Sequence, residues 1–148
     1  MTVTTKFTIM KKYILTLFFI ITGLSLSAQQ DSGVTITVVI ENVLNDRGNI
    51  LAGLYTEDNF MRGAGVAEYA TKAKAGELSF EFTDITPGDY AITVMQDFNE
   101  NQRMDFEASG MPVEPYGTSG SDMDMGPPSF YNSKFTVGDE DLEIRIRF

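Results

Sequence analysis

The chain has 148 residues, of which 11 are basic and 21 acidic, so its formal net charge is −10 at neutral pH. It contains no cysteine and no histidine, which excludes disulfide bonds, thiolate metal sites and catalysis by serine–histidine or cysteine–histidine pairs. The excess of acids also argues against nucleic acid as a partner, because phosphates require a basic surface.

The first 28 residues are typical of a secretory signal peptide. Residues 10–12 form a short basic region, residues 13–26 are apolar, and small residues precede a cleavage site near Ala28, with Met10 as the expected start. The apolar run is shorter than the ~20 residues that a membrane span needs, so we expect cleavage, with a retained N-terminal anchor as the alternative. The mature chain is then periplasmic or extracellular, has no membrane span and carries a net charge of about −13.

The mature chain is expected to form one domain. Residues 29–33 are a short linker, and residues 34–148 are long enough to bury a single hydrophobic core. Residues 34–43 are rich in β-branched side chains and end in a turn sequence at residues 45–49, after which a strand resumes at Ile50. We expect these two strands to pair as a hairpin.

The middle of the chain continues with strands. Residues 59–77 contain two glycines that interrupt any helix, so a loop with a short strand or one helical turn is expected there. Residues 78–85 alternate apolar and polar side chains, which places Leu78, Phe80 and Phe82 on one face. Pro87-Gly88 then predicts a tight turn and a second hairpin, whose next strand has Tyr90, Ile92 and Val94 on one face.

The strand pattern stops between residues 97 and 132, where Gly, Pro, Ser, Asn and Asp dominate. A structureless excursion of this length inside a compact domain is more often functional or ligand-stabilised than idle. Strands resume at residues 133–137 and 142–148. Together these elements predict an all-β fold: a single-domain antiparallel β-sandwich, Ig-like or prealbumin-like, with about seven strands and one long irregular loop.

The excursion begins with the spacing of a calcium-binding loop. Calcium takes about six to eight oxygen ligands from carboxylates, amides and backbone carbonyls. Side chains that suit positions 1, 3, 5 and 9 of such a loop are Asp97, Asn99, Asn101 and Asp105. Arg103 falls at position 7, where the backbone oxygen binds. Two positions depart from the pattern: Gln102 replaces the usual Gly of position 6, and Ala108 replaces the acid of position 12.

The remaining ligands of such a site would come from nearby acids. Glu107 lies one residue before position 12, and Asp122 and Asp124 follow later in the excursion. The alternative is a polar turn that holds no metal, because Asp and Asn side chains readily cap turns by bonding to the backbone. The sequence leaves both interpretations open.

Four groups of residues follow one another in a recognisable order. They are Pro87, Gly88, Tyr90 and Ala91; Asp97, Asn99, Asn101 and Asp105; Gly110, Pro112, Glu114, Tyr116, Gly117 and Ser119; and Pro127, Pro128 and Phe130. In these motifs the chain resembles the family of small secreted bacterial proteins catalogued as domain of unknown function 2141. The resemblance implies a β-sandwich and no assigned activity. Gln96 stands where that family usually has His, and Gln102 where it usually has Gly, which would cost Gln102 about 1 kcal/mol in backbone strain.

These observations predict a secreted acidic β-sandwich whose long loop binds Ca²⁺ for a structural or ligand-presenting purpose. The first alternative is a metal-free module that binds a protein or glycan of the cell envelope, since Pro, Met and aromatic residues gather in the second half of the excursion. The second alternative is a hydrolase with paired carboxylates. We expect no enzyme, because so small a domain has little room for a deep substrate cleft.

Overall fold

The computed structural model describes residues 33–120 and 127–148, which belong to one compact unit, Gly33–Phe148. The predicted signal peptide, residues 1–28, and nearly all of the predicted linker lie outside the described residues. In the described part of the chain, no helix has the length and apolar character needed to cross a membrane.

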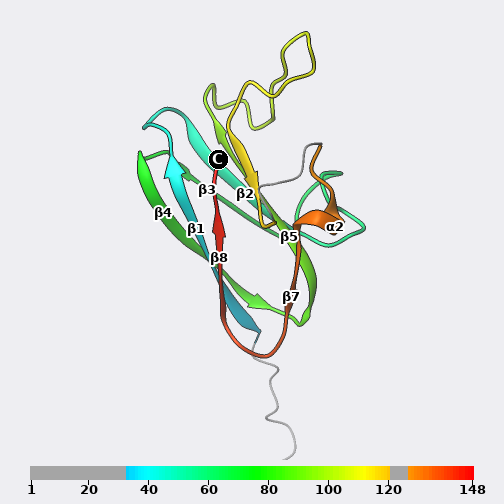
Figure 1. Cartoon of the computed structure of the whole chain (residues 1–148). Coiled ribbons are helices and arrows are strands. Elements are labelled where there is room, and N and C mark those ends of the chain that lie inside the picture. The colour runs from blue at the N-terminus through cyan, green and yellow to red at the C-terminus, as the bar shows by residue number, and fades with distance from the viewer. Residues whose placement is uncertain (1–32, 121–126) are drawn as a thin grey trace, which may run out of the picture. The chain divides into compact units, whose positions relative to one another are not determined.

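Eight strands and one four-residue helix make up the described part of the chain (Figure 1). They are β1 (Val34–Val43), β2 (Asn49–Tyr55), β3 (Ala67–Lys72), β4 (Gly76–Ile85), β5 (Gly88–Asp97), β6 (Tyr116–Thr118), α2 (Phe130–Ser133), β7 (Lys134–Val137) and β8 (Leu142–Ile146). The short strand expected within residues 59–77 is β3. The strand predicted from Ser133 begins one residue later, because Ser133 ends the helix.

The strands form two sheets that enclose one core, which confirms the predicted all-β sandwich. The first sheet has the order β4-β1-β8, and the second has the order β3-β2-β5-β6, with β7 also paired to β5. All pairs are antiparallel except β1 and β8, which run parallel, with Val38 opposite Ile144. The predicted antiparallel sandwich therefore contains one parallel pair. The parallel pair arises because the chain crosses from β7 in one sheet to β8 in the other.

Neither predicted hairpin forms. β1 and β2 lie in different sheets, and so do β4 and β5, so the turns after β1 and β4 carry the chain across the edge of the sandwich. Each turn is held by a side chain from β5 instead of by a strand ladder. Gln96 binds the first turn at Arg47, and the Tyr90 hydroxyl donates to the Thr86 carbonyl at 3.0 Å in the second. The turn residues were recognised in the sequence, but the sheet that each strand joins depends on these distant contacts.

The core lies between the two sheets and follows the predicted alternation. Its buried members are Val34, Ile36, Val38, Ile40, Val43, Ile50, Ala52, Leu54, Ala73, Phe80, Phe82, Ile85, Tyr90, Ile92, Val94, Val137 and Ile146. Tyr69 of β3 stacks on Phe80 of β4 with ring centroids 4.0 Å apart, so an aromatic pair joins the edge strands of the two sheets. Such pairs add about 0.5–1.5 kcal/mol beyond the area they bury.

The end of the chain closes the first sheet. Asn42 of β1 binds the terminal residue twice: its side chain donates to the Phe148 carbonyl at 3.1 Å and accepts from the Phe148 amide at 2.8 Å. On the outer face of the same sheet, Arg145 bonds Glu143 and Glu41, and these contacts raise the pKa of the Arg145 guanidinium, the Glu41 hydrogen bond being the larger cause.

A charged clasp joins β5 to β7 in the second sheet. The Asp89 carboxylate accepts from the Thr136 hydroxyl at 2.7 Å and from the Lys134 ammonium at 2.9 Å. The Thr136 hydrogen bond, followed by Lys134, holds the pKa of Asp89 below its ordinary value. Because the folded pKa is lowered, the ionised carboxylate stabilises the fold at neutral pH, and this contribution is lost as the pH falls through the folded pKa.

We therefore expect Asp89→Asn to melt at a lower temperature than the unchanged protein at pH 7. The difference should shrink as the pH falls below the ordinary pKa of an Asp carboxyl and disappear once the pH lies below the lowered pKa of folded Asp89. Thermal melts from neutral to acidic pH measure it, with Asp139→Asn, which removes an exposed carboxylate between β7 and β8, as the control. A deficit that persists unchanged in acid would contradict the assignment of the clasp to the ionised form.

Candidate functional site

The predicted calcium-type loop begins at a buried carboxylate. Asp97 is the last residue of β5 and is fully buried. Its Oδ1 accepts from the Asn101 amide at 3.2 Å and its Oδ2 from the Gln102 amide at 2.8 Å. These two bonds curl the chain back on itself within one turn. Gln102 takes φ +62, the left-handed conformation in which Gly is favoured, so the strain expected at position 6 is confirmed.

Three further side chains converge on one point. The Nδ2 atoms of Asn99 and Asn101 both donate to Asp105 Oδ2, at 2.6 and 2.8 Å. Their Oδ1 atoms accept backbone amides two residues ahead, at Asn101 and Arg103. The loop therefore brings together three of the four predicted side chains, those of Asn99, Asn101 and Asp105. The fourth, Asp97, binds only backbone amides of the same loop, as in a polar turn.

The other two predicted residues have different places. Arg103 lies between Asn101 and Asp105 in the chain, and its Nε lies 3.7 Å from Asp105 Oδ1. Glu107 does not hydrogen-bond to the cluster of Asn99, Asn101 and Asp105. Its carboxylate accepts from the Ser109 hydroxyl at 3.2 Å, and its amide donates to the Met111 carbonyl, so it belongs to a small hairpin over residues 105–113. Asp122 and Asp124 lie outside the described residues.

Glu114 is an important residue that the sequence analysis did not assign to the site. Its side chain is only 3% exposed, and its two oxygens accept from the backbone at both ends of the loop, from the Phe98 amide at 2.9 Å and from the Asp105 amide at 3.2 Å. Glu114 therefore links the two ends of the loop, at Phe98 and Asp105. In the sequence Glu114 stands between prolines within one of the motifs that carry the family resemblance, and neither feature indicates burial.

Gln96 supports the site from the opposite side. It is fully buried, and its Nε2 donates to the carbonyls of Asn45 and Arg47, both at 2.9 Å. This amide fixes the turn between β1 and β2 against the start of the loop, where the Arg47 guanidinium lies 5.1 Å from the centre of the Phe98 ring. Gln96 is thus a structural tie in this chain, at the position where the resembled family usually has His.

The arrangement can offer oxygen atoms to a hard cation. The two oxygens of Asp97 each accept one amide and keep a second lone pair, whereas Asp105 Oδ2 already accepts the amides of Asn99 and Asn101. A cation beside Asp105 would have to replace the two amide N–H bonds to that carboxylate and rotate both amides, at a net cost of about 1 kcal/mol per bond. Among the described residues, no group of three or more acidic side chains is placed to hold a metal, so such a site would depend on the amides and on backbone oxygens.

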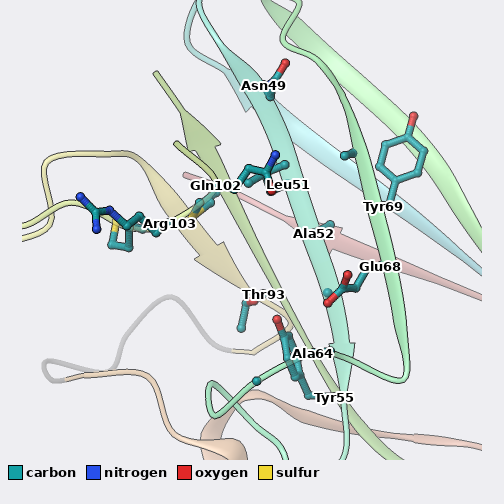
Figure 2. A pocket seen from close by; sticks show the side chains of 15 residues that line it. Asn49, Leu51, Ala52, Tyr55, Ala64, Glu68, Tyr69, Thr93, Gln102 and Arg103 are labelled. Atoms are coloured by element: carbon teal, nitrogen blue, oxygen red, sulfur yellow. The ribbon is translucent and has the colours of Figure 1, made fainter. Parts of the chain in front are cut away.

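The same loop borders a groove on the outer face of the second sheet. Gln102, Arg103 and Met104 of the loop line it together with residues of β2, β3 and β5 and with Gly63 and Ala64, and the groove has a volume of about 670 Å³. Figure 2 shows Gln102 and Arg103 beside the strands of the sheet. The folded loop therefore helps to form a groove whose volume is in the range of small-molecule binding sites.

A family model matches residues 38–145, nearly the whole sandwich. Its description is "uncharacterized protein conserved in bacteria", domain of unknown function 2141. No curated protein matches the chain.

We expect Glu114→Gln to lower the free energy of unfolding by about 1–3 kcal/mol, because Gln has one acceptor oxygen where two backbone amides need partners. Glu107→Gln removes the same charge from the exposed hairpin and should change it by less than about 0.5 kcal/mol. Urea unfolding of both variants at neutral pH measures the difference. Equal losses in the two variants would show that charge, and not the closure of the loop by Glu114, is responsible.

Proposed function

We propose a function for this chain, which belongs to the bacterial family described as domain of unknown function 2141: it is an exported β-sandwich whose loop from Asp97 to Asp105 binds a divalent cation, calcium by the nature of its ligands. Asp97, Asn99, Asn101 and Asp105 supply side-chain oxygens, and Arg103 supplies its backbone carbonyl. The bound ion fixes the loop and the hairpin of residues 105–113 that it carries. Export rests on the signal-peptide pattern of residues 1–28.

The observation that supports this proposal best is that Asn99 and Asn101 meet at the Asp105 carboxylate, in a loop that the Asp97 carboxylate curls through a left-handed turn at Gln102. A loop that only caps turns needs each Asn to bond the backbone locally. It does not need both amides to meet on the Asp105 carboxylate. The mixture of carboxylate, amide and backbone oxygens on an irregular loop suits calcium better than magnesium, which requires near-ideal octahedral geometry and retains several waters.

A second candidate function is that of a metal-free interaction module of the cell envelope. It is favoured by the 105–113 hairpin, on which Phe106, Met111 and Val113 are 62%, 63% and 53% exposed. Exposed apolar side chains gathered on one short segment are typical of surfaces that bind a protein or a glycan. In this version Asp105 and the two Asn amides hold the hairpin without an ion.

Catalysis is not part of the proposed function. The acids of the loop are used to shape it, since Asp97 and Glu114 both accept backbone amides with both oxygens. A glycosidase-type pair would instead leave one carboxyl group free to protonate a leaving group and the other free to act on the sugar or on water.

The calcium proposal predicts a thermal shift. Binding to the folded state alone, at about one hundred times the dissociation constant, adds about 2.7 kcal/mol, which for a domain of this size raises the melting temperature by on the order of 10 °C. Melts of the chain lacking residues 1–28, first in chelator and then with calcium or magnesium from micromolar to millimolar, measure it. We expect calcium to give the larger shift.

Two variants of equal charge make this test specific. Asp105→Asn removes a proposed ligand and should abolish the calcium shift, whereas Asp139→Asn removes an exposed carboxylate elsewhere and should retain it. Because each comparison is made within one variant, a change in intrinsic stability does not affect the result. Absence of a shift in the unchanged protein after removal of retained metal would contradict calcium binding and favour the interaction module.

A further inference from the structure

The outer face of the second sheet carries its side chains in rows that run across β3, β2 and β5. In one row Gly53 lies between Glu68 and Thr93, and in the next row Leu51 lies between Ala70 and Met95. These two rows form the floor of the 670 Å³ groove (Figure 2). The groove therefore has a polar end and an apolar end on one continuous surface.

At the polar end, Gly53 has no side chain and so leaves space on the sheet for the ring of Tyr55. The Tyr55 ring lies over this glycine, since a Cβ placed there would come within 2.5 Å of the Tyr55 hydroxyl and 2.6 Å of the ring. Residues directly opposite on antiparallel strands lie about 5 Å apart, so the Glu68 carboxylate and the Thr93 hydroxyl flank the same spot. A carboxylate, two hydroxyls and an aromatic ring thus share one small area.

The apolar end lies beside the calcium-type loop. Leu51 and Met95 are half-buried neighbours in the sheet, and Met104 of the loop lines the same part of the groove. These unbranched or flexible side chains adapt readily to the shape of an apolar guest.

The charge of the polar end is negative and uncompensated. Glu68 accepts the Gly65 amide at 3.2 Å, and no ion pair to it is formed within residues 33–120 and 127–148. The one cationic side chain of the groove, Arg103, is at the other side of the groove from Glu68 (Figure 2), with its Nε 3.7 Å from Asp105. The net charge of −10 adds an attractive field for cations.

We propose that this groove binds a small organic amine with an apolar body. The ammonium group lies between the Glu68 carboxylate and the Thr93 and Tyr55 hydroxyls, and the Tyr55 ring adds a cation–π contact. The apolar body covers Leu51, Met95 and Met104. Ammonium groups carry up to three donors, which suits the carboxylate and two hydroxyls that line this end of the groove, whereas an anion would be repelled by Glu68. The polar contacts come from strands, so the site does not depend on calcium.

The test compares three probes of similar shape and different charge: 2-phenylethylamine, 2-phenylethanol and 3-phenylpropionate. Each is titrated into the protein in chelator at neutral pH, and binding is followed by the amide NMR signals of Gly53, Glu68 and Thr93. We expect saturable binding of the amine and at least about tenfold weaker binding of the alcohol and the acid, because only the amine pairs with Glu68.

Matched variants separate the site from general attraction to an acidic protein. Glu68→Gln should weaken binding of 2-phenylethylamine at least about tenfold, while it keeps an oxygen for the Gly65 amide. Glu81→Gln removes the same charge from the exposed face of β4 in the other sheet and should leave the affinity unchanged. Gly53→Ala displaces the Tyr55 ring and should also weaken binding, and NMR spectra confirm that each variant is folded.

Three results would overturn the proposal. They are equal affinity for the amine and the alcohol, equal weakening by Glu68→Gln and Glu81→Gln, and no saturable binding of the amine at tens of millimolar. Because the titration is made in chelator, each of these results leaves the calcium proposal for the loop unaffected. A calcium shift in the melts likewise says nothing about the amine.

Discussion

The end of β5 holds the structure together through two consecutive buried polar side chains that point to opposite faces of the sheet. Gln96 points inward and fixes the crossover between the two sheets, and Asp97 points outward and folds the long loop over the sheet. Burial of such groups is tolerated only when they are hydrogen-bonded, and in the described residues no buried side-chain nitrogen or oxygen lacks a partner. Both the crossover between the sheets and the shape of the loop therefore depend on the dipeptide Gln96-Asp97.

The groove on the second sheet also depends on the loop that Asp97 folds, because loop residues line it. Glu114 closes the loop from below, and Lys72 of β3 pairs with Glu100 at 2.7 Å on the exposed side. The loop is thus fastened to β3 and to the start of β6 as well as to β5, so its residues 102–104 stand at a fixed position beside the sheet. These residues border the outer face of the second sheet and turn it into a groove, which the strands alone would not form.

The sequence was informative where a property depends on neighbouring residues. The alternation in β4 and β5 correctly identified their buried faces, and the spacing from Asp97 correctly indicated the left-handed backbone at Gln102. It failed where a property depends on distant residues. The turn at residues 44–48 has the composition of a hairpin turn, yet Gln96, which lies 51 residues from Asn45, makes it a crossover. The role of Glu114 could not be predicted for the same reason, since its hydrogen bonds go to Phe98 and Asp105 at the two ends of the loop.

The parallel pairing of β1 with β8 has a consequence for how the protein acquires its structure. β1 is the central strand of its sheet, and one of its two neighbours is the last strand of the chain; the contacts that join them, such as Thr35 to Asp141, span 106 residues. Contacts of such long range are associated with slow folding. The first sheet is complete only when β1 has paired with β8, so one edge of the apolar strand β1 stays open until residues 106 positions apart have met. An open edge of an apolar strand can pair with another chain, so this topology makes β1 the strand most exposed to aggregation during folding.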